Sequence, residues 1–76
     1  MTGEMTLIIV ARNGLSTFAT FFDSKIKRLR KQVDATTDEA AKKKLNATIK
    51  KREKLVKVVR AADTGLGAYL LELEDE

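Results

Sequence analysis

Apolar side chains recur at the spacing of one helix face over residues 15–33. At about 100° per residue they fall within an arc of roughly 60°, whereas the basic residues of this segment lie outside the arc. The arc holds Leu15, Phe18, Phe22, Ile26, Leu29 and Val33. The pattern predicts an amphipathic helix over residues 15–34, with Asn13 or Ser16 as its N-cap.

A second helix is predicted over residues 37–63. Thr36 and Glu39 have the spacing of a capping box at its start, and Gly65 is a left-handed stop at its end. One side of this helix is lined by Ala41, Leu45, Ile49, Val56 and Val59. Because the connection has only about two or three residues, the two helices are antiparallel neighbours.

Both ends of the chain carry strand signals. Residues 5–10 are apolar and rich in β-branched side chains, and Arg12, Asn13 and Gly14 form a turn signal behind them. Residues 68–73 alternate between two faces, which is typical of a half-exposed strand. Pairing of these strands gives an α+β fold, mostly α, in which an antiparallel two-helix hairpin is flanked by short terminal strands in β-α-α-β order. The alternatives are a short buried helix at the first segment and a third helix at the last, the latter giving an all-α three-helix fold.

Size and composition make residues 1–76 a single small domain, which ends in an acidic tail at residues 74–76. The chain has no Cys, His or Pro. Disulfides and the usual zinc ligands are therefore absent, and no proline interrupts a long helix. A chain of this length buries about 60% of its unfolded surface, so helix packing or self-association has to supply its stability.

Four apolar residues fall outside the two helical stripes, namely Phe21, Leu55, Val58 and Ala62. In an antiparallel hairpin they share the end that lies next to the predicted strands. We expect the sheet or a partner subunit to cover them; the alternative is that they are scattered surface residues, which are common. The edges of a two-stranded sheet also predict a homodimer that forms a four-stranded sheet.

Charge is segregated along the chain, although the overall net charge is only +4. Residues 25–60 hold fourteen basic and four acidic residues, a net charge of +10, and the rest of the chain holds one basic and seven acidic residues, a net charge of −6. Such a distribution attracts polyanions or acidic partners.

The residue types needed for catalysis or for a bound cofactor are missing. A serine nucleophile needs a base, usually His, and the chain has none, so its two serines are caps or surface residues. Gly65 and Gly67 lack the third glycine of a dinucleotide-binding loop. Acidic residues cluster only in the tail and at Asp38 and Glu39, without the loop spacing of a cation site. We therefore expect a protein that is not an enzyme and that binds no cofactor or metal.

A membrane anchor is the competing interpretation of residues 5–22, which a basic segment follows. Arg12 would then lie mid-membrane, at a cost of about 2.5–3.5 kcal/mol. The apolar run is also too short for a secretory signal. We expect a soluble, cytoplasmic protein with no membrane partner.

The candidate binding residues are lysines on the outer side of the second helix. Their spacing keeps them on one face, where each can contact a nucleic-acid phosphate. The set is Lys43, Lys50, Lys54 and Lys57, with Arg28 and Lys31 flanking. Lysine is a point charge without the base-reading fork of arginine, and aromatic residues are few, so RNA or DNA would be bound with little sequence specificity. The competing interpretation is a solvated face, because lysine is also a soluble helix former.

Two further assignments stay open. Arg52 falls in the centre of the second apolar stripe, and three interpretations of it are open. Its aliphatic part lies along the stripe with the charged head at the edge, it forms a structural ion pair with Asp23, or it belongs to a binding site. The alternative function is an oligomeric protein–protein assembly or accessory module that docks on an acidic protein surface, as in a viral structural or host-inhibiting protein. The acidic tail then contacts the basic hairpin of its own or a neighbouring subunit, or is a solubilising end.

Overall fold

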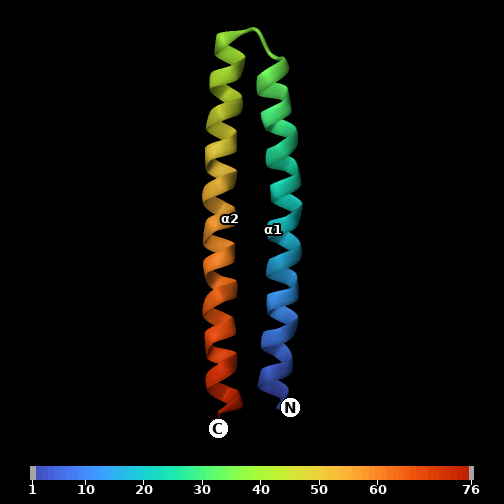
Figure 1. Ribbon diagram of the computed structural model, residues 1–76, viewed down its shortest axis with the longest axis vertical. Coiled ribbons are helices and arrows are strands. Elements are labelled where there is room, and N and C mark those ends of the chain that lie inside the picture. Colours follow the sequence, from blue (N-terminus) through green and yellow to red (C-terminus); the bar gives the residue numbers. More distant parts are fainter. Residues whose placement is uncertain (1, 76) are drawn as a thin grey trace.

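The computed structural model describes residues 2–75 and consists of two long antiparallel helices (Figure 1). Helix α1 spans Gly3–Ala35 and helix α2 spans Glu39–Glu74, and residues 36–38 connect them. The Cα atoms of the hairpin form a rod of 58 × 14 × 12 Å. Both ends of the chain lie at one end of the rod, and the connection lies at the other. We call the half of the rod that holds the chain ends the terminal half, and the half that holds the connection the loop half.

The predicted helical hairpin is confirmed, and the predicted terminal strands are wrong. Residues 5–10 belong to α1 and residues 68–73 belong to α2, and residues 2–75 contain no strand. The three-helix alternative is wrong as well, because α2 continues past Asp63 without a break. Of the predicted acidic tail at residues 74–76, Glu74 belongs to α2. Glu76 lies outside the described residues.

Each helix starts at a polar cap. The Thr2 hydroxyl oxygen accepts a hydrogen bond from the Met5 N–H at 3.1 Å, which caps α1. The Asp38 carboxylate accepts one from the Ala40 N–H at 3.1 Å, which caps α2. An acid at this position also favours the positive start of the helix.

Several residues that we expected at helix boundaries lie elsewhere. Asn13 and Ser16 lie inside α1, and Gly65 lies inside α2 with no positive φ. Thr36 is the C-cap of α1, so it does not form the predicted capping box with Glu39. The physical reason is that contacts between the helices hold both of them beyond the points where local signals favour a stop.

These contacts form a single seam of side chains spaced alternately three and four residues apart, the repeat of coiled-coil packing. The α1 side of the seam consists of Met5, Ile8, Arg12, Leu15, Ala19, Phe22, Ile26, Leu29 and Val33. The α2 side consists of Lys42, Leu45, Ile49, Arg52, Val56, Val59, Asp63, Leu66, Leu70 and Leu73. Every seam residue is buried or half-buried. The central hydrophobic cluster is formed by Ala19, Ile26, Ile49 and Val56.

The seam also contains an ion pair between the two helices. The Arg12 Nε donates a hydrogen bond to the Asp63 carboxylate at 2.8 Å. Gly67 lies beside this pair, and a Cβ atom at its position would be 2.9 Å from the guanidinium carbon of Arg12. The missing side chain at Gly67 therefore leaves room for Arg12. Because Arg12 and Asp63 neutralise each other, the contact between α1 and α2 continues where polar residues occupy the seam.

Substitution of the two α2 glycines tests this packing. Gly65→Ala should raise the free energy of unfolding by about 0.5–1 kcal/mol, because alanine is the better helix former and nothing lies within 4 Å of its Cβ position. Gly67→Ala should give a smaller gain or a loss, because its Cβ displaces the Arg12 guanidinium from Asp63. Urea denaturation followed by circular dichroism measures the difference. An equal gain at both positions would contradict the packing of Arg12 against Gly67.

Candidate nucleic-acid interface

One side of the hairpin carries two ion pairs between the helices. Arg30 pairs with Glu53 at 3.0 Å, and Arg60 pairs with Asp23. Each of these residues directly follows a seam residue in the sequence, which turns it about 100° from the seam to the same side of the hairpin. We call the surface formed by residues that directly follow a seam residue the ion-paired flank.

Three of the predicted binding lysines lie on the ion-paired flank. Lys43, Lys50 and Lys57 each follow a seam residue, and their seven-residue spacing puts neighbours about 10 Å apart along α2. All three are exposed, and none takes part in an ion pair within residues 2–75. We call them the lysine row. Its ammonium groups are accessible to an external anion.

The other three predicted residues lie around the row and on α1. Lys54 is next to the row on the outer side of α2, and Lys31 is on the outer side of α1. Arg28 directly precedes the seam residue Leu29, which places it on the flank opposite the lysine row. The structure therefore brings four of the six residues together on α2, and it places Lys31 and Arg28 on other surfaces of the loop half.

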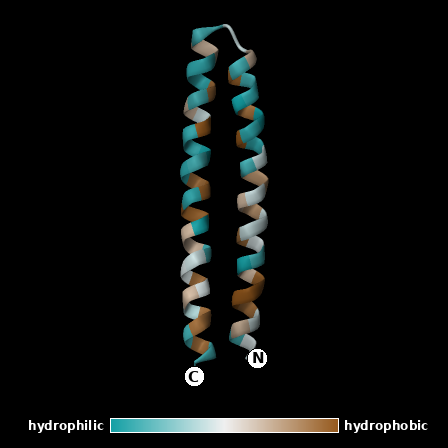
Figure 2. Ribbon diagram, in the orientation of Figure 1, coloured by the Kyte–Doolittle hydropathy of each residue, from teal (hydrophilic) through white to brown (hydrophobic). Residues whose placement is uncertain are grey.

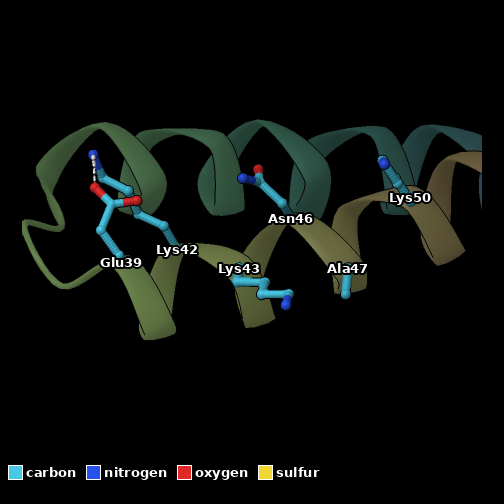
Figure 3. A pocket seen from close by; sticks show the side chains of 6 residues that line it. All are labelled: Glu39, Lys42, Lys43, Asn46, Ala47 and Lys50. Carbon is cyan, nitrogen blue, oxygen red and sulfur yellow. Dashed lines mark ion pairs between the residues drawn. The ribbon is translucent and has the colours of Figure 1, made fainter.

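A shallow hollow on α2 contains two residues of the lysine row (Figure 3). It is lined by Glu39, Lys42, Lys43, Asn46, Ala47 and Lys50. Glu39 lies 3.9 Å from Lys42 and offsets that charge. Sequence reasoning missed Asn46, whose amide offers a donor and an acceptor between Lys43 and Lys50. Its distance of three and four residues from these lysines was the available signal.

The charge of the loop half is not cancelled locally. Residues 25–60 carry a net charge of +10, and Figure 2 shows hydrophilic residues over most of the loop half. Two of the four acids in this segment are already engaged, because Glu39 pairs with Lys42 and Glu53 pairs with Arg30. The lysine row therefore adds to a field of one sign.

Arg52 and Asp23, the predicted ion pair, have different partners in the structure. Asp23 pairs with Arg60, and the Arg52 guanidinium lies 5.9 Å from the centre of the Phe22 ring. Within residues 2–75 no ion pair joins Arg52 to Asp23. The reason is rotational, since Arg52 points into the seam while Asp23 lies on the ion-paired flank beside Arg60.

Helix α1 is long and apolar enough to cross a membrane by length and composition, and no other helix of residues 2–75 is. Its apolar part contains Arg12, which pairs with Asp63 of α2. Core helices of soluble proteins pass the same test of length and composition.

Comparisons with family models, with curated proteins and with solved structures find no match for this chain. The geometry and charge of the hairpin are therefore what supports a proposal on its function.

The role of Arg52 can be tested through stability. Arg52→Leu should raise the free energy of unfolding by about 1 kcal/mol, because it replaces a half-buried charge with an apolar side chain that faces Phe22. The control, Arg60→Leu, removes the pair with Asp23 and should lower stability by about 1 kcal/mol or less. Urea titrations of both variants measure the two changes. A larger loss at Arg52 than at Arg60 would indicate that Arg52 balances the charge of Asp23.

Proposed function

We propose that this protein is a small, non-enzymatic binding protein whose basic hairpin contacts nucleic-acid phosphates with little sequence specificity. The observation that carries the proposal is the lysine row. Lys43, Lys50 and Lys57 are exposed, lie in line on one helix, and have no acidic partner within residues 2–75. Lys54 beside them extends the row across the outer side of α2.

The shape of the loop half suits contact with a phosphate backbone. The hairpin is a narrow rod, and a pair of helices is about 20 Å across, wider than the major groove of about 12 Å. The α2 face therefore lies along the backbone and does not bring both helices into the groove. Contacts from lysines to phosphates position a protein without reading the bases.

The aromatic residues do not extend this surface. Phe18 and Phe21 directly precede seam residues and therefore lie on the flank opposite the lysine row, and Phe22 is half-buried in the seam. Stacking on unpaired bases is therefore not offered beside the lysines. We propose duplex RNA or DNA as the ligand, in the cytoplasm and without a membrane partner. The alternative is an acidic protein surface, which the same row would contact through carboxylates.

Binding should depend steeply on salt. Fluorescence anisotropy with short labelled RNA and DNA duplexes should show micromolar or tighter binding at about 50 mM salt and a loss of about a hundredfold at about 200 mM. The double variant Lys43→Gln with Lys50→Gln should lower the affinity about tenfold or more and reduce the salt slope by about 2, because two phosphate contacts are lost.

The matched control is Lys44→Gln with Lys51→Gln, which makes the same change of charge one residue further along α2. Lys44 and Lys51 directly precede seam residues, so they lie on the opposite flank and should contribute less. Equal losses in the two double variants would show that the overall field binds, and not the row. Absence of wild-type binding at about 50 mM salt would refute the proposal and favour the acidic protein surface.

A further inference from the structure

The flank opposite the lysine row is apolar from the middle of the rod to the end that holds the termini. Six exposed apolar residues directly precede a seam residue, which turns all of them to the same side. They are Leu7, Phe18, Phe21, Leu55, Val58 and Tyr69. We call this surface the apolar flank. The Tyr69 hydroxyl donates a hydrogen bond to the Glu4 carboxylate at 2.9 Å, and both residues precede a seam residue, so this side is shared by the two helices.

The apolar flank is large and has small residues between its large ones. Ala11, Gly14, Ala62 and Gly65 also directly precede seam residues. Side chains of both helices cover about 20 Å along the rod and about 20 Å across it, or roughly 400 Å². This area is typical of the largest apolar patch on a soluble protein, and such a patch is often a functional surface.

The hairpin also needs the burial that a partner would provide. Only five hydrophobic residues within residues 2–75 are buried, namely Ile8, Ala19, Ile26, Ile49 and Val56. By contrast, Phe21 is 54% exposed and Val58 is 60% exposed. A chain of this length has little stability to spare, so covering these side chains would add a large share of its apolar burial.

We propose that a second copy of this chain covers the apolar flank, with the two hairpins antiparallel. The charges at the two ends of the flank favour a second, antiparallel copy as the partner. Glu4 and Glu72 lie at one end, and Lys25 and Arg28 lie at the other, each directly before a seam residue. Measured along α1 from Gly14, the middle of the patch, Glu4 is about 15 Å away in one direction and Lys25 about 16 Å away in the other.

A second copy turned end for end therefore places its acidic end on the basic end of the first, and the reverse contact forms at the same time. A parallel arrangement would instead bring Lys25 and Arg28 of both copies together, which like-charge repulsion disfavours. The charged ends extend the contact to about 40 Å by 20 Å, or about 800 Å² per copy, the area of a standard stable interface with an apolar centre and a polar rim.

The inference does not rest on nucleic-acid binding, because the lysine row lies on the other flank and stays exposed in such a dimer. Either proposal can fail while the other holds. Oligomeric state is measured without nucleic acid, and the variants that test it leave Lys43, Lys50 and Lys57 unchanged.

Two valines of nearly equal exposure provide a matched test of the surface. Val58 is 60% exposed on the apolar flank, and Val10 is 62% exposed on the outer side of α1. By sedimentation equilibrium, the wild-type chain should be a dimer at micromolar concentration. Val58→Glu should weaken dimerisation about tenfold or more, because it buries a charge in the apolar centre, whereas Val10→Glu should leave it unchanged. Circular dichroism should show both variants helical.

Two results would overturn the proposed surface. One is a wild-type chain that sediments as a folded monomer at about 100 µM or that stays in solution only with detergent. The other is an equal effect of Val58→Glu and Val10→Glu on the dimer. Either result would indicate that a different protein or a lipid surface covers the apolar flank.

A charge swap tests the antiparallel arrangement. Arg28→Glu and Glu72→Arg should each weaken the dimer, and the double variant should return its dissociation constant to within about threefold of the wild-type value. Within one copy these two residues lie about 40 Å apart along the rod, so restoration requires contact between copies. A double variant no better than either single one, in a chain that Val58→Glu still dissociates, would exclude the antiparallel arrangement.

Discussion

The ion pair between Arg12 and Asp63 is the contact on which the length of the hairpin depends. Their side chains are 38% and 31% exposed, so either residue alone would hold a partly desolvated charge at the contact between the helices. The two face each other at 2.8 Å, and Gly67 leaves space for the guanidinium. The seam therefore continues from the loop to the termini. A slip of one turn would separate this pair and also Arg30 from Glu53, so these polar contacts specify one register.

Once the register is set, the position of each residue relative to the seam decides what its side chain meets. The tripeptide from Leu55 to Lys57 illustrates this: Val56 is buried in the seam, Leu55 lies on the apolar flank, and Lys57 lies in the lysine row. About 100° of rotation per residue separates these three environments. The repeated pattern along α2 thus produces two different surfaces on opposite sides of one thin rod.

The sequence was sufficient for the central part of the hairpin and insufficient for its ends. The apolar stripe from Leu15 to Val33 predicts residues 15–34 of α1 correctly because local periodicity and packing agree there, although Ala19 and not Phe18 lies in the seam. Residues 5–10 favour a strand by composition, but the seam extends through Ile8 and overrides that preference. Arg12 and Gly65 each indicated the end of an element when considered alone. Neither residue reveals that Asp63 lies opposite Arg12 and lets both helices continue. The exposed lysines were predictable, whereas the choice of Arg60 over Arg52 as partner of Asp23 required the register.

The two proposed surfaces have a joint consequence for binding. In an antiparallel dimer the apolar flanks are covered and the two loop halves point to opposite ends of the assembly. Each loop half then brings its own lysine row, so a polyanion that spans both would gain from the high effective concentration of the second row. Affinity for long duplexes would then exceed that for short ones, and it would fall when the dimer dissociates even with every lysine intact. The proposed dimer would also account for the segregation of charge along the chain, because apolar side chains hold two copies together only where like charges do not oppose them.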